Sequence, residues 1–277
     1  MLASAPRPPV PRNTSPPIQS RAAGVAPGIA ALVVGLHAIA SVAASTAHAA
    51  PDRTAKPEPA KREAPKDDRK DDRKDEPKDD LKIVDKPIPF DDERVRLTLA
   101  YRRQHSDPDA RDIAIEPRVI VLHYTAGGTA RGTFEYFSGN HMESGRPQLA
   151  AAGDVNVSSH FLVDRDGTIY RLMPETRFAR HCIGLNHIAI GIENVGDEHR
   201  WPLTDAQVEA DARLVRHLAA RYPITHLIGH SEAVRLDGKI YFQERDPRYR
   251  NSKPDPGERF MKLVRARLAD LKLQGPP

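Results

Sequence analysis

Residues 118–124 read RVIVLHY, a continuous apolar run that ends in a histidine and a tyrosine. Such a run is typical of a strand that is buried on both faces, in the middle of a sheet covered by helices. Residues 188–194, IAIGIEN, predict a second strand in which the three isoleucines face one way and Ala189, Gly191 and Glu193 face the other. The small Ala189 and Gly191 predict free space beside Glu193 for a bound molecule.

Around these two strands, helical and extended patterns alternate along the chain. Helices are predicted over 91–104, 129–137, 204–220 and 256–271, the third of them opening with capping-box spacing. Residues 160–163 and 168–172 flank a Gly-containing turn and predict a hairpin, and residues 225–230 predict a further short strand. This order predicts an α/β fold with a mixed central β-sheet flanked by helices, in a single domain.

The N-terminal region has the features of an export signal. Residues 1–49 combine a Pro-rich extension with an uncharged run, 22–43, and a small-x-small motif at 47–49 suited to cleavage before Ala50. Cleavage there predicts an exported protein, periplasmic or extracellular. The alternative is an uncleaved anchor, because the run is nearly long enough to cross a bilayer. Membrane association is expected only in that case.

A charged linker is predicted between this signal and the globular domain. Residues 50–86 are of low complexity, and 51–86 contain twelve bases and twelve acids with few apolar residues. Such a segment cannot bury enough surface to offset its chain entropy, so we expect it to be disordered. The globular domain is predicted over 87–277, with 27 bases and 26 acids. This balance excludes a nucleic-acid partner, because phosphate binding needs a local basic excess.

Two histidines and an aspartate are candidate metal ligands. His123 and His230 each end a short apolar strand, where the loops of an α/β sheet can open into a crevice. With Asp255 they offer two imidazoles and one carboxylate, which leave a fourth tetrahedral position open on a zinc ion. The single cysteine, Cys182, excludes a Cys-based cluster. Asp255 also has another interpretation, because DPGE at 255–258 would place it as the N-cap of the last helix.

Two further residues are candidates for the chemistry at this site. Glu193 is the candidate acid–base residue, because it shares a strand face with small residues; the alternative is a solvated carboxylate. Lys253 lies two residues before Asp255 and can reach the same site if the loop is extended, although most loop lysines are solvated.

Five segments in this order carry a family resemblance: VLHYTA (121–126), SSHF with DRDG (158–167), IGIEN (190–194), GHSE (229–232) and KPDPG (253–257). Together they resemble the zinc-dependent N-acetylmuramoyl-L-alanine amidases of the second amidase type, relatives of peptidoglycan-recognition proteins and phage amidase-type lysozymes. The resemblance implies Zn²⁺ bound by His123, His230 and Asp255. It also implies that Glu193 is the general base, that Lys253 stabilises the oxyanion, and that substrate is contacted by His181 and Asn186.

The chain departs from some of these relatives at two positions. Ser159 stands where the phage and recognition-protein branches carry a catalytic tyrosine, and Asp255 stands where they carry a cysteine ligand. Both differences favour the bacterial amidase branch that uses a glutamate.

The activity that the resemblance implies is hydrolysis of the amide between N-acetylmuramic acid and L-alanine, in peptidoglycan or muropeptides, by a monomer. Two alternatives remain open at this point. One is a module that recognises peptidoglycan without cutting it, and the other is a zinc peptidase acting on the stem peptide.

Overall fold

The computed structural model describes residues 81–277 except 240 and 277, and these residues belong to one compact unit. The predicted signal peptide and the predicted linker up to residue 80 lie outside the described residues. In chain order the elements are β1 (Ile83–Asp85), α1 (Asp92–His105), β2 (Val119–Tyr124), α2 (Ala130–Ser138), α3 (Pro147–Ala151), β3 (Phe161–Val163), β4 (Ile169–Arg171), β5 (Ala189–Asn194), α4 (Asp205–Arg221), β6 (His226–Gly229), the 3₁₀ helix η1 (His230–Leu236), α5 (Glu258–Arg267) and the 3₁₀ helix η2 (Ala269–Leu271).

The strands form one mixed sheet in the order β1-β4-β3-β5-β2-β6. β3, β5, β2 and β6 run parallel to one another, and β4 runs antiparallel to β3 as the second strand of the predicted hairpin. The prediction of an α/β fold with a mixed central sheet is confirmed. Because β5, β2 and β6 are parallel neighbours, their carboxyl ends lie at the same edge of the sheet.

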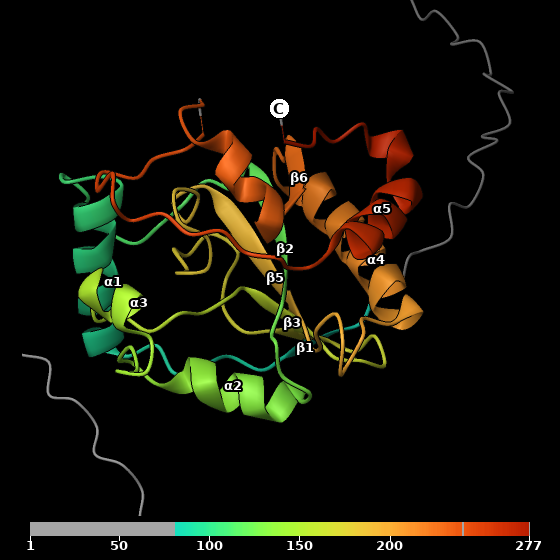
Figure 1. Cartoon of the computed structure of the whole chain (residues 1–277), viewed down its shortest axis with the longest axis horizontal. Helices are drawn as coiled ribbons and strands as arrows, with labels where there is room; N and C mark the ends of the chain where they lie inside the picture. Colours follow the sequence, from blue (N-terminus) through green and yellow to red (C-terminus); the bar gives the residue numbers. More distant parts are fainter. Residues whose placement is uncertain (1–80, 240, 277) are drawn as a thin grey trace, which may run out of the picture. The chain divides into compact units, whose positions relative to one another are not determined.

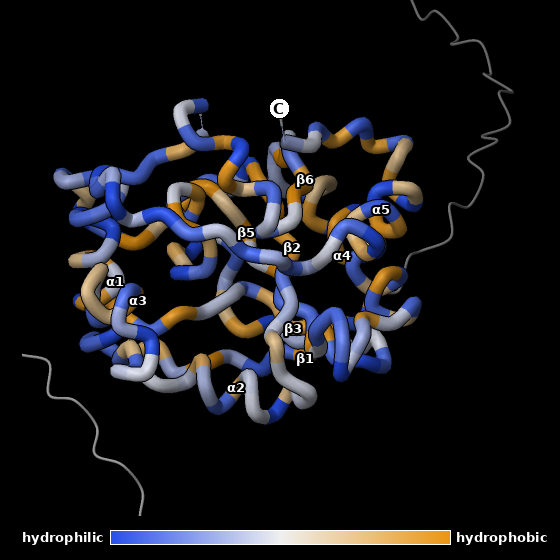
Figure 2. The backbone as a smooth tube through the Cα atoms, viewed as in Figure 1, coloured by the Kyte–Doolittle hydropathy of each residue, from blue (hydrophilic) through white to orange (hydrophobic). Residues whose placement is uncertain are grey.

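Helices α4 and α5 cover one face of the sheet, and α2, η1 and the loop before β5 cover the other (Figure 1). Ile120 and Leu122 of β2 and Ile190 and Ile192 of β5 pack against α4 and α5 with no exposed surface. Burying each such side chain stabilises the fold by about 1.5–3 kcal/mol. Ile188 precedes the strand and packs with the cluster on the opposite face, so only two of the three isoleucines behave as predicted. Figure 2 shows hydrophobic residues concentrated in these central strands.

The helix starts follow from local capping. Asp91 accepts the backbone N–H of Arg94 at 2.9 Å and begins α1, and Thr204 with Gln207 forms the predicted capping box of α4. The last helix differs from its prediction over 256–271. It starts two residues later, at Glu258, and ends at Arg267, after which η2 forms a separate turn.

The boundary between linker and domain also needs correction. Residues 83–85, which the sequence assigned to the linker, form β1 and pair in parallel with β4 at the edge of the sheet. Ile83 packs against the hydrophobic core between the sheet and helices α4 and α5. This contact stabilises the short strand. No helix within the described range is long and apolar enough to cross a membrane.

Candidate metal centre and catalytic cleft

Three predicted ligands meet at the carboxyl edge of β2 and β6. His123 is the fifth residue of β2, and His230 directly follows β6 as the first residue of η1. The register pairs Leu122 with Gly229, so the two histidines that follow lie side by side. Asp255 lies in the loop before α5, and its carbonyl accepts the backbone N–H of Ser231 at 2.7 Å. The sheet therefore positions both imidazoles, and a backbone hydrogen bond ties the aspartate loop to them.

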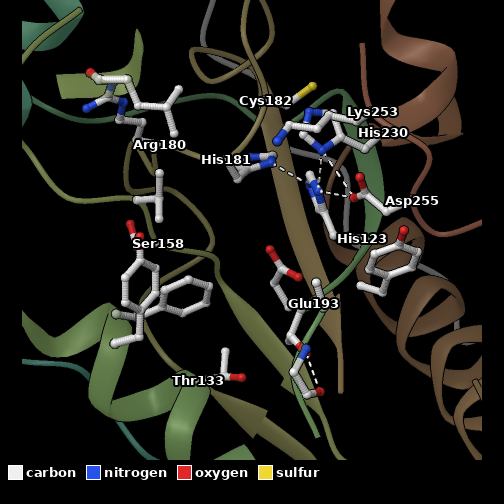
Figure 3. A pocket seen from close by; sticks show the side chains of 18 of the residues that line it. His123, Thr133, Ser158, Arg180, His181, Cys182, Glu193, His230, Lys253 and Asp255 are labelled. Atoms are coloured by element: carbon white, nitrogen blue, oxygen red, sulfur yellow. Dashed lines mark hydrogen bonds and ion pairs between the residues drawn. The ribbon is translucent and has the colours of Figure 1, made fainter. Parts of the chain in front are cut away.

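The three side chains point their ligand atoms at one another (Figure 3). His123 Nδ1 lies 3.0 Å from His230 Nδ1, and Asp255 Oδ2 lies 3.2 Å from each of these two atoms. All three residues are buried, and His230 Nε2 has no hydrogen-bond partner within the described residues. Two imidazole nitrogens and one carboxylate oxygen are the donor set that suits zinc with one open position. The residues present therefore fit a zinc ion.

The protonation states of these groups also suit a cation. Burial, with a smaller contribution from the neighbouring His230, lowers the pKa of His123 to about 4, so the imidazole is neutral at physiological pH. Burial alone would raise the pKa of Asp255, but the adjoining imidazoles of His123 and His230 hold that pKa well below the ordinary value. Metal ligands must be neutral imidazoles and ionised carboxylates, which is the state these pKa shifts favour.

The interpretation of Asp255 as a helix cap is wrong. The N-cap of α5 is Gly257, at φ +91°, and no side chain caps this helix. Pro256 therefore lies outside the helix, and the Asp255 carboxylate does not cap it. Its carboxylate Oδ2 instead lies 3.2 Å from the Nδ1 atoms of His123 and His230.

Glu193 lies beside this centre. It stands opposite His123 in the β2–β5 ladder, and its side chain points into the same pocket (Figure 3). The side chain is partly buried, and its Oε2 atom is fully buried without a hydrogen-bond partner in the described part of the chain. Burial, with a smaller contribution from the charge of Asp255, raises the pKa of Glu193 to about 8. A carboxyl group with a pKa near neutrality can both accept and donate a proton.

The space predicted beside Glu193 is occupied. A Cβ atom on Gly191 would lie 2.8 Å from Cγ and Nδ1 of His181 and 3.0 Å from Oγ of Ser159. The small residue at position 191 therefore makes room for the His181 ring, and no substrate space is left at that position.

Lys253 and the two predicted substrate-contact residues also line the cleft. The positive charge of Lys253 lowers the pKa of both His123 and Glu193, although other causes outweigh it at Glu193. Asn186 is buried, and its Oδ1 accepts the backbone N–H groups of His181 and Cys182 at 2.8 and 2.7 Å. Asn186 thus organises the loop that carries His181, and the contact of either residue with substrate stays a prediction.

The cleft has a volume of about 490 Å³ and extends well beyond the metal centre. Its distal walls come from α1, α2 and several loops, through residues that were not candidates from the sequence. These wall residues lie far apart in the chain and share no motif or periodicity, so no local signal marks them. Their polar and aromatic members include Tyr101, Thr133, Tyr136, Arg146, Arg180, Tyr249 and Asn251.

Fold and site together define a class of protein. Two histidines and an aspartate meet at a parallel-strand edge, with an unpartnered carboxyl oxygen beside them and a cleft in front. This arrangement suits an α/β hydrolase that has a candidate metal site.

The comparisons with known proteins make this class specific. The sequence pattern of the N-acetylmuramoyl-L-alanine amidase family matches residues 114–258, so the chain belongs to this family and is an enzyme. It is 30% identical over 149 residues to the 1,6-anhydro-N-acetylmuramyl-L-alanine amidase AmpD of Citrobacter freundii, across 48% of this chain and 79% of AmpD.

Two solved structures are also similar. The amidase LysC from Clostridium intestinale is 23% identical, with a TM-score of 0.45 over 68% of this chain and 97% of LysC. A selenomethionine derivative of AmpD is 24% identical, with a TM-score of 0.42 over 67% of this chain and 93% of that chain.

Proposed function

We propose that this protein is a zinc-dependent amidase that cleaves the bond between the lactyl group of N-acetylmuramic acid and L-alanine, in peptidoglycan or its fragments. The observation that supports it best is the convergence of His123, His230 and Asp255, whose ligand atoms lie 3.0–3.2 Å apart. A zinc ion held by these side chains would supply Lewis acidity and lower the pKa of a water molecule toward about 7.

The remaining chemistry belongs to Glu193 and Lys253. Glu193 takes the proton of the attacking water through its unpartnered Oε2 and then passes that proton to the leaving amine of L-alanine. The Lys253 ammonium stabilises the negative charge on the tetrahedral carbonyl oxygen, in a cleft with few other cations. A buried, desolvated carboxyl group and a nearby ammonium are the two groups that amide hydrolysis requires beside a Lewis acid.

A digest of muropeptides tests this function. Purified protein should release stem peptides with a free L-alanine amine, detected by mass spectrometry, and a chelator should abolish the release until Zn²⁺ is restored. Saturable binding without a released amine would indicate a recognition module, and cleavage within the stem would indicate a peptidase. Because AmpD is named for a 1,6-anhydro substrate, the digest should compare anhydro-muropeptides with intact wall.

Two variants separate metal binding from proton transfer. Glu193→Ala should keep bound zinc and lose about 10²–10⁴ in kcat, whereas Asp255→Ala should lose zinc by metal analysis. Glu116→Ala is a matched control, because its side chain is 88% exposed and does not line the cleft. A Glu193→Ala enzyme with near-normal turnover would remove Glu193 from its role.

We also propose that the mature protein is exported and begins at Ala50. The small-x-small motif before that residue supports this. Mass spectrometry of the protein recovered from the periplasm or medium would give the mature N-terminus, and an intact Met1 in a membrane fraction would indicate an anchor instead.

A further inference from the structure

His181 occupies a position that links a predicted metal ligand to the sheet. Its ring lies over Gly191 of β5, where any Cβ would approach it to 2.8 Å. It packs edge-on against His123, with ring centroids 5.1 Å apart and an interplanar angle of 85°. The side chain is therefore seated between β5 and His123, and it is held by contacts within the protein.

Two hydrogen bonds decide which nitrogen of each ring carries the proton. His181 Nε2 lies 3.2 Å from the carbonyl oxygen of Ala189, which can only accept, so Nε2 carries the hydrogen. A neutral imidazole has one N–H, so His181 Nδ1 is an acceptor. It lies 3.0 Å from His123 Nε2, which must then be the donor. The lone pair of His123 is consequently on Nδ1, the atom that faces His230 and Asp255.

The loop that carries His181 is held by hydrogen bonds within the loop. The backbone N–H groups of His181 and Cys182 both donate to Asn186 Oδ1, and the Leu185 N–H donates to the Cys182 carbonyl at 3.1 Å. The neighbouring imidazole, His160, is engaged elsewhere: its Nδ1 accepts the Gly191 N–H and its Nε2 donates to the Arg177 carbonyl. His181 is thus the imidazole directed at Nε2 of His123.

We infer that His181 is a positioning residue, which fixes the Nε2–H tautomer of His123 and so presents Nδ1 to the metal. This inference rests on the proposed zinc site. His230 differs, because its Nε2 has no partner among the described residues and its tautomer is not fixed in this way. Ligating histidines commonly donate their second N–H to such a partner, and losing that partner typically costs about 10–100-fold in metal affinity.

The test compares two substitutions of His181 in the full chain. His181→Asn keeps an acceptor oxygen near the Nδ1 position, whereas His181→Phe keeps the ring volume without an acceptor. His187→Asn is the matched control on the same loop. The zinc dissociation constant is measured by competition with a chromophoric chelator. We expect His181→Phe to bind zinc about 10–100-fold more weakly, with His181→Asn and the control within about threefold of wild type, a difference of about 0.65 kcal/mol.

A second measurement keeps the inference separate from the proposed function. In metal-free protein labelled with ¹⁵N-histidine, two-bond ¹H–¹⁵N correlation spectra report the tautomer of His123: Nε2–H in wild type and a mixture in His181→Phe. Equal zinc affinity and an unchanged tautomer in His181→Phe would overturn the inference, as would an equal loss in His181→Asn. If wild-type protein cleaves no muropeptide while zinc affinity and the tautomer still depend on His181, the proposed function fails and the positioning role stands. A wild-type protein that binds no zinc would overturn both.

Discussion

Replacing Glu193 with glutamine is expected to stabilise the metal-free protein at neutral pH. Burial raises the pKa of Glu193 from 4.5 to about 8. Between these two values the folded state binds the proton more tightly than the unfolded state, so the stability of the wild type falls as pH rises through this window. Glutamine has no proton to lose and avoids the fall, while it keeps nearly the same shape.

The size of the effect follows from the width of that window. At about 1.4 kcal/mol per pH unit, the interval from 4.5 to pH 7 amounts to about 3 kcal/mol. Because the side chain is only partly buried, solvent screening reduces this value, and we expect a gain of about 2 kcal/mol. For a domain of this size that corresponds to a rise in Tm of about 4–8 °C.

Urea unfolding of chelator-treated protein between pH 4 and pH 8 measures the gain. The difference between Glu193→Gln and wild type should be near zero at pH 4 and largest near pH 8. The control Glu116→Gln, at a carboxylate that is 88% exposed, should follow the wild type throughout. A stability difference between Glu193→Gln and wild type that does not change with pH would refute the reasoning, as would a variant that is less stable than wild type at pH 7. Bound zinc should reduce this stability difference, because a nearby cation favours the ionised carboxylate of Glu193.

Four other predictions concern separate parts of the molecule. Burial on α4 raises the pKa of Asp211 to about 7, so wild-type stability falls as that group ionises. In urea unfolding, the free energy of unfolding of Asp211→Asn relative to wild type should therefore increase by at least about 1 kcal/mol from pH 4 to pH 7. Ile190→Ala should cost about 4 kcal/mol in urea unfolding, since this fully buried side chain leaves a cavity between β5 and α4, and zinc content should not change. Lys253→Met should keep zinc by metal analysis and lower kcat by about 10²–10³ through loss of an oxyanion partner. Chelation should lower Tm, and zinc at about 1,000 times its dissociation constant should restore about 4 kcal/mol of stability.

Much of the fold is readable from local sequence. The run at 118–124, the alternation at 188–194 and the capping box at Thr204 each match an observed element within one or two residues. These signals are local, because burial pattern and capping depend on neighbours within a few residues in the chain. β1 escaped prediction because its three residues become a strand only by pairing with β4, more than eighty residues away.

For the candidate site, the sequence identifies the residues but not the directions of their side chains. Family resemblance and strand-end position identify His123, His230, Asp255 and Glu193 as candidates, and the structure brings their side chains into one pocket. The direction of the Asp255 carboxylate could not be predicted from the sequence, because the segment DPGE at 255–258 also suits a helix cap. Only the backbone of 255–257, with Gly257 at φ +91° as the N-cap of α5, turns it toward the histidines.

The sequence by itself determined five of the six strands, the hairpin, the main helices and the residue types available for metal and proton chemistry. The tertiary structure alone decided where each polar atom points: Gly191 is small to admit the ring of His181, and that ring in turn bonds to His123. The physical reason is that periodicity and capping are set by near neighbours in the chain, whereas a hydrogen bond between residues 58 positions apart exists only after the sheet has brought them together.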